Sequence, residues 1–327
     1  MKKVLLSPIE HRDFHTESLE QEINAYFKDV LFDPIVQKFE AAKIRVNSGE
    51  SALWSAIMDG TVTYRDGTFA GTFSAAISKE LRSIGAKRVG TRDFALPPDE
   101  LPVPLRGAVA HAKHKQDELH AEILAFLLAV PEHIERAPLG IPFTKTVDSV
   151  AKDVQQQFTE SVAKVEGLAP TSLPEGTVAR SAETFRSAAE TAIRAYTLEV
   201  VEHLRSRTEA NRNHGEGAER LAHLVEADFG KAQRKAHFLA ENETSRLVAH
   251  LAKERFESIG SNSYVWVTQG DAKVRPTHHE SNDHRVLNRR VFKWENPPIV
   301  DPATGRRAHP GEDYNCRCHA HAVLLVK

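Results

Sequence analysis

The stretch "HPGEDYNCRCHAHAVL", residues 309–324, holds both cysteines of the chain and runs into an apolar terminal segment. It closes a region whose pattern differs from everything before Gly260, where a long helical periodicity stops. "SYVWVTQ" at 263–269 and "RVFKW" at 290–294 are rich in β-branched and aromatic residues, which favours strands. "HAVLLV" at 321–326 has the same character. The tail is therefore predicted to be a small α+β module with short strands, entered from the helix that ends at Gly260.

The rest of the chain is predicted to be predominantly helical, so that the fold class is α+β. Residues 1–104 form a mixed α/β region, in which the Asp-Gly pair of "TVTYRDGTFAG" predicts a hairpin. The proline-rich "ALPPDELPVPL" at 95–105 cannot be a helix interior and is interpreted as a connector. Long helices follow over 105–228, with a break expected at Pro131 and one helix from about Ser181 to Asn213. The C-terminal module occupies 229–327.

Charge and hydropathy exclude several function classes. The 327 residues carry 43 Lys and Arg against 45 Asp and Glu, which gives no support to a nucleic-acid binder acting through its overall charge. No stretch approaches the roughly 20 apolar residues of a membrane span, so no membrane partner is expected. The N-terminal "MKKVLLSPIEHRD" has too short an apolar core for a signal peptide. We therefore expect a cytoplasmic chain, in which the two cysteines are reduced.

The cysteine pair leaves several chemistries open. A disulfide between Cys316 and Cys318 would close a very small, strained ring. On a strand, side chains at i and i+2 share a face, which suits a structural zinc ion held by these thiols with His309 and His278. Two buried residues on a terminal strand would give the same spacing without a metal. A catalytic thiol at Cys316, with a histidine base, is another interpretation.

Two further groups of polar residues have functional interpretations. The "HHESNDH" cluster at 278–284 suggests a metal-dependent nuclease, although such clusters are common in polar loops. Glu243 and Arg246 stand at i and i+3 of the helix that leads into the module. They are either a surface ion pair of little energetic weight or an orienting pair beneath the module.

Taken as a unit, the tail resembles the C-terminal domain of the phage Mu F-like minor head proteins, the phage head morphogenesis family, over about 230–325. The matching order is "ETSR" at 243–246, "VWVT" at 265–268, "VRPTH" at 274–278, an Asn-Asp pair, "RVFKWENPP" at 290–298 and "HPGEDYNCRC" at 309–318. The motif residues of this series are Glu243, Arg246, Arg275, His278, Asn282, Asp283, Trp294, Pro310 and Gly311. The chain departs from the family at Asn242, which precedes "ETSR", and in offering three histidines for one turn position.

The resemblance implies a virion protein of a tailed phage or prophage, present in the host cytoplasm during assembly. Its expected partners are the portal protein and the major capsid or scaffold proteins, and its expected work is head morphogenesis, DNA packaging or DNA delivery without enzymatic activity. From Ser261 to Lys327, ten Lys and Arg face seven Asp and Glu, a mild excess that permits a weak non-specific DNA contact. The alternative function is a metal-dependent nuclease or transferase that acts through the C-terminal His/Cys module.

Overall fold

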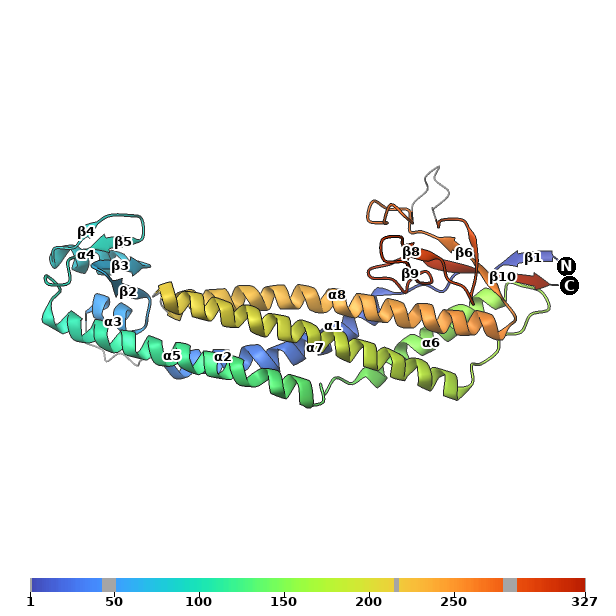
Figure 1. Cartoon of the computed structure of the whole chain (residues 1–327), viewed down its shortest axis with the longest axis horizontal. Helices are drawn as coiled ribbons and strands as arrows, with labels where there is room; N and C mark the ends of the chain where they lie inside the picture. The colour runs from blue at the N-terminus through green and yellow to red at the C-terminus, as the bar shows by residue number, and fades with distance from the viewer. Residues whose placement is uncertain (1, 43–50, 215–217, 279–286, 327) are drawn as a thin grey trace. The chain divides into compact units, whose positions relative to one another are not determined.

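The chain forms two compact units, each assembled from segments that are discontinuous in the sequence. A computed structural model describes residues 2–42, 51–214, 218–278 and 287–326 (Figure 1). The first unit combines Met1–Ala25, Gly140–Ile193 and Arg234–Lys327, and the second combines Tyr26–Leu139 and Arg194–Gln233. The expected fold class, α+β with long helices and a C-terminal module of short strands, is confirmed. The borders expected at 104 and 228 stay a prediction.

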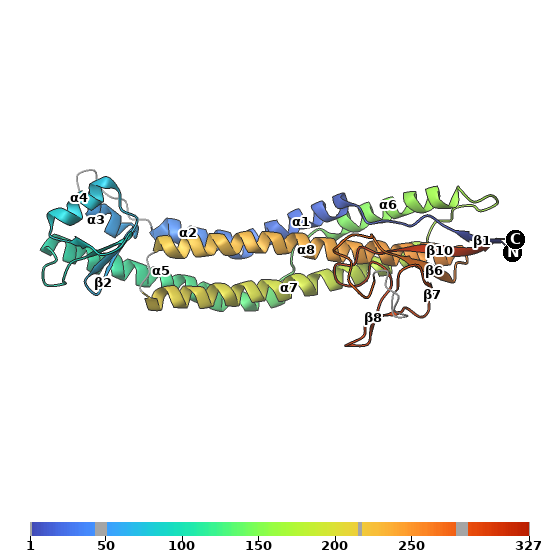
Figure 2. The same ribbon diagram turned by 90° about the horizontal axis from the view of Figure 1, so that it is seen from above.

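The first unit contains a four-stranded antiparallel sheet in the order β1-β10-β6-β7. Its strands are β1 (Lys2–Leu5), β6 (Ser263–Val267), β7 (Val291–Lys293) and β10 (His319–Val326). The three C-terminal strands were predicted, but β1 was not: it lies along β10, with Lys3 opposite Leu325 (Figure 2). A two-stranded hairpin, β8 (Ile299–Asp301) and β9 (Arg306–Arg307), completes the C-terminal region.

Four helices supply residues to the first unit: α1 (Asp13–Phe27), α6 (Phe143–Val162), α7 (Glu175–His214) and α8 (Ala218–Ser258). A series of aromatic rings links the helices to the sheet. The ring centroid of Phe158 of α6 lies 6.0 Å from that of Phe256 of α8. Phe256 in turn stacks on Trp294, with 6.5 Å between the ring centroids. Trp294 lies 4.3 Å from Tyr264 of β6, whose side chain is fully buried. Strand β6 is thus held over a helical layer, because its alternate residues turn inward.

The second unit contains the sheet β2-β3-β5-β4 and the remaining helices. Besides the parts of α7 and α8 within Arg194–Gln233, its elements are the π-helix η1 (Lys28–Phe32), α2 (Asp33–Ala42), α3 (Ala52–Met58), β2 (Val62–Arg65), β3 (Thr68–Gly71), α4 (Ala75–Ser83), β4 (Lys87–Arg88), β5 (Asp93–Ala95) and α5 (Val103–Arg136). The expected hairpin is β2–β3, and its turn residues Asp66 and Gly67 have φ of 49° and 82°. A two-residue turn of this kind requires positive φ at both positions.

The break expected at Pro131 is wrong, because α5 continues through it to Arg136. Proline removes one helical hydrogen bond and costs about 3 kcal/mol in a helix interior. Here the helix buries Leu127, Val130 and Ile134 on one face around the proline. Burial of three such side chains contributes about 1.5–3 kcal/mol each, which is enough to offset the lost bond. Among the described residues, no helix combines the length and apolar character needed to cross a membrane.

Candidate functional site

The site lies in the first unit, where the segment after β6 meets the segment before β10. Residues 275–278 form a turn in which the His278 backbone N–H donates to the Arg275 carbonyl at 2.8 Å. Cys316 and Cys318 stand immediately before β10, and the Cys316 N–H donates to the Asp313 carbonyl at 3.0 Å. Strand β10 pairs with β6 from His319↔Val267 onward, so this pairing carries the two cysteines to the end of β6 that leads to the turn.

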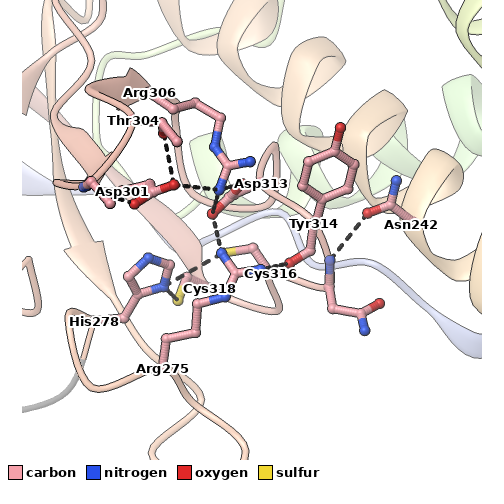
Figure 3. A network of polar contacts seen from close by, with 12 residues as sticks. Asn242, Arg275, His278, Asp301, Thr304, Arg306, Asp313, Tyr314, Cys316 and Cys318 are labelled. Carbon is pink, nitrogen blue, oxygen red and sulfur yellow. Dashed lines mark hydrogen bonds and ion pairs between the residues drawn. The ribbon is translucent and has the colours of Figure 1, made fainter.

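Three side chains converge at this point (Figure 3). His278 Nδ1 lies 3.5 Å from Cys318 Sγ and 3.9 Å from Cys316 Sγ. The potential ligand atoms of these three residues all lie within 4.8 Å of one another, and all three residues are buried. Both cysteines are free thiols. Within the described residues, this is the group of histidine, cysteine and carboxylate side chains with the spacing of a metal site.

The two thiols do not hold their protons equally. The pKa of Cys316 is lowered, because Cys318 donates a hydrogen bond to its sulfur and His278 adds a second contact. The pKa of Cys318 is raised, because its proton is held by Cys316 and because its sulfur is buried. The indole of Trp266 and the charge of Arg275 act on Cys318 in the opposite direction. The pair therefore favours one thiolate over two.

His309 lies outside this group, although the sequence offered it as a ligand. Its Nδ1 is 3.0 Å from the Tyr264 hydroxyl, and its ring lies 5.5 Å from that of Trp294. Its backbone N–H donates to the Glu312 carboxylate at 2.7 Å. Burial lowers the pKa of His309, so protonation of the ring beside the aromatic residues is disfavoured. His309 therefore packs against Tyr264 of β6 and does not join the two cysteines.

A buried carboxylate connects the turn to the loop between β9 and the cysteines. The Asp313 carboxylate accepts a hydrogen bond from Arg275. It also forms an ion pair with Arg306 at 3.0 Å. Arg275 also donates to the backbone carbonyl of Tyr314, and the Arg306 guanidinium lies 5.1 Å above the Tyr314 ring. Figure 3 shows Asp313 between the two guanidinium groups. Because these contacts span the loop, they fix the approach of Cys316 to His278.

Helix α8 contributes the pair that the sequence singled out. Arg246 lies 3.2 Å from the carboxylate of Glu243, which is buried. Asn242 donates to Glu243 at 2.8 Å, and its own side-chain oxygen accepts from the Asn315 backbone N–H at 3.1 Å. The Thr244 hydroxyl lies 2.8 Å from Nε2 of His11, a residue of the N-terminal segment. Sequence reasoning missed the roles of Asn242 and Thr244, since an isolated Asn or Thr in a helix carries no local signal for a long-range contact.

The remaining motif residues have structural positions. Trp294, Pro310 and Gly311 are buried, and the Trp294 indole N–H donates to Ser261 at 3.4 Å. Asn282 and Asp283 lie outside the described residues. A cavity of about 250 Å³ is lined by both cysteines, by His309 and Pro310, and by Ser245 of α8. A second cavity, of about 380 Å³, is lined by Arg246, Arg306 and Tyr314 among others.

Comparison with known proteins covers this same region. Residues 202–321 match the family model described as phage Mu protein F like protein. The resemblance of the C-terminal region to this family is thereby confirmed. The match contains Glu243, His278 and both cysteines.

A relative in Haemophilus influenzae, named only as an uncharacterized protein, is 35% identical over 98 residues. That alignment covers 30% of this chain and 19% of the relative, so the chain spans about a fifth of the relative's length. No solved structure matches the chain.

Proposed function

We propose that the chain is a minor head protein of a tailed phage or prophage, held at the portal or the capsid interior and without enzymatic activity. The observation that carries this proposal is the match of residues 202–321 to the phage Mu protein F like family. Its site of action is the virion, and it passes through the host cytoplasm during assembly. Its work is head morphogenesis, DNA packaging or DNA delivery.

The use of polar groups in the C-terminal region supports a structural role. Asp313 and Asn242 are buried and bonded to neighbouring segments of the same unit, and the buried Glu243 pairs with Arg246 of its own helix. A general acid or base must instead reach a substrate proton. Cys316 is 5% exposed, so its sulfur is poorly placed for nucleophilic attack. These contacts favour a rigid docking module over a nuclease or transferase.

The proposed partners are the portal protein and the major capsid or scaffold proteins, with a weak, non-specific DNA contact. The net charge of −2 supports protein partners, because DNA binding of high affinity requires many phosphate-neutralising cations. Tyr314 is exposed, and Arg306 and Arg307 form the nearby strand β9. Tyrosine and arginine are enriched at protein interfaces.

Purified phage heads test this proposal. We expect the protein to be present in heads in fewer copies than the major capsid protein and to co-purify with the portal when heads are disrupted. Deletion of its gene should lower the yield of infectious particles, and expression of the wild-type chain in trans should restore it. Absence of the protein from purified heads would overturn the proposal.

The enzymatic alternative has a separate test. Purified protein is incubated with DNA across a series of divalent cations, and with His278→Ala and His309→Ala variants as controls. We expect no cation-dependent cleavage. Turnover that disappears in either variant would replace the structural proposal with the enzymatic one.

A further inference from the structure

We propose that His278, Cys316 and Cys318 bind one Zn²⁺ ion, with water in the fourth coordination position. This inference concerns a site inside the C-terminal region and does not depend on the proposed head function. The ligands come from the turn after β6 and from the segment that enters β10, which are about 40 residues apart in the sequence. A bound ion would therefore join two segments whose positions define the module.

The distances between the ligand atoms fit a tetrahedral ion. With bonds of about 2.3 Å to sulfur and 2.0–2.1 Å to nitrogen, two ligand atoms of a tetrahedron lie roughly 3.6 Å apart. The distances observed from His278 Nδ1 are 3.5 Å to Cys318 Sγ and 3.9 Å to Cys316 Sγ. All three atoms lie within 4.8 Å of one another, so small side-chain adjustments bring them onto a common centre.

Hydrogen bonding does not account for the burial of this imidazole. His278 is 2% exposed, and its Nε2 has no hydrogen-bond partner in the described part of the chain. Its Nδ1 faces two sulfur atoms, which are weak donors and acceptors. A buried histidine with no strong partner costs free energy, whereas coordination through a ring nitrogen satisfies it.

The chemistry of the donor atoms also favours a soft divalent cation. Cysteine coordinates a metal as the thiolate, so both thiols would lose their protons on binding. Two thiolates with one imidazole select Zn²⁺ over Mg²⁺ or Ca²⁺, which prefer oxygen ligands.

The competing chemistries are weaker. A disulfide between residues i and i+2 requires strained geometry, and the two sulfurs are free thiols here. Both cysteine residues line a cavity of about 250 Å³, which is large enough for a water ligand beside them. His309 and His319 also line that cavity, but neither belongs to the group of convergent ligands.

Metal analysis of the full chain, expressed without a histidine tag, tests the site. We expect about one zinc ion per chain after dialysis, the stoichiometry of a single tetrahedral site. Cys316→Ser, Cys318→Ser and His278→Asn should each lose it. His309→Asn and His319→Asn are the matched controls and should retain it. Loss of zinc in either control with retention in His278→Asn would overturn the assignment.

A second measurement does not depend on variants that fold. Apo protein, prepared with a chelator under reducing conditions, is titrated with Co²⁺. Binding at the proposed site predicts thiolate-to-cobalt charge-transfer absorption that saturates at about one equivalent and is displaced by Zn²⁺. A wild-type chain that holds no zinc and gives no charge-transfer absorption would overturn the proposal.

Discussion

Asn242 of helix α8 accepts a hydrogen bond of 3.1 Å from the backbone N–H of Asn315, the residue before Cys316. Asn315 has φ of 50°, a conformation that asparagine adopts more readily than most residues. The bond therefore ties a left-handed backbone position in the loop to the middle of a long helix. It places the first cysteine of the candidate site relative to α8, although the two asparagines are 73 residues apart.

Replacement of Asn242 by alanine tests this connection. The substitution removes the acceptor for Asn315 and the donor to Glu243, and we expect it to lower the free energy of unfolding by about 1–2 kcal/mol. Asn262→Ala, at an exposed position before β6, is the matched control and should change it by less than about 0.5 kcal/mol. Urea denaturation measures both. Equal effects from the two variants would contradict the role given to Asn242.

Asp313 provides a second test, because one buried carboxylate serves two arginines. Asp313→Asn keeps the shape but removes the carboxylate that Arg275 and Arg306 share, so we expect the free energy of unfolding to fall by about 1.5–3 kcal/mol. Asp301→Asn is the control: its carboxylate lies 3.9 Å from Arg306 and is more exposed. That variant should lose less than about 1 kcal/mol. Thermal unfolding at low and high salt compares them, and a larger loss for Asp301→Asn would refute the assignment.

The sequence predicted the local elements of this protein well. Alternating and β-branched residues located β6, β7 and β10, and the Asp-Gly pair located the β2–β3 hairpin. These features depend on residues that are neighbours in the chain. The pairing of β1 with β10 was not predictable, because four residues of ordinary composition do not specify a partner more than 300 residues away.

The sequence predicted only part of the candidate site, again because the site depends on contacts between residues that are far apart in the chain. The cysteine spacing predicted a shared face on a strand, whereas both cysteines stand just before β10, where strand alternation does not set their directions. Several histidines were also equally available as partners in the sequence. The choice of His278 depends on the turn that begins at Arg275, and the different position of His309 depends on its packing against Tyr264. Both are tertiary contacts, so composition and spacing could not separate the two histidines.

Gly311 lies in the loop that leads to the cysteines and has φ of 86°. A Cβ at this position would lie 3.1 Å from the Ala249 side chain of α8. Gly311→Ala therefore adds a tight contact to the backbone strain, which by itself costs about 1–2 kcal/mol. Gly305→Ala is the matched control, since its φ is 71° but a Cβ there meets nothing within 4 Å. We expect a lower melting temperature for Gly311→Ala than for Gly305→Ala, and the reverse order would contradict the close packing on α8.

The stability of the first unit should depend on pH through His15. Burial lowers the pKa of His15 from 6.5 to about 4, although the Asp153 carboxylate at 3.4 Å opposes this shift. Below pH 6.5 the unfolded chain takes up a proton that the folded chain does not. The contribution of the neutral His15 to the free energy of unfolding is therefore fully present above about pH 6.5 and is lost as the pH falls toward 4. Because solvent screens part of the shift, we expect a loss on the order of 1–2 kcal/mol.

His15→Gln should remove this part of the pH dependence, and His237 provides a control of opposite sign. The pKa of His237 is raised, because the Glu20 carboxylate accepts its hydrogen bond at 2.7 Å. Its contribution is present below pH 6.5 and is lost as the pH rises through its folded pKa. Unfolding free energies measured from pH 4 to 8 should thus give wild-type-minus-variant differences of opposite slope for His15→Gln and His237→Gln. A flat difference for His15→Gln would show that the imidazole titrates equally in both states, and that its burial beside Asp153 does not control stability.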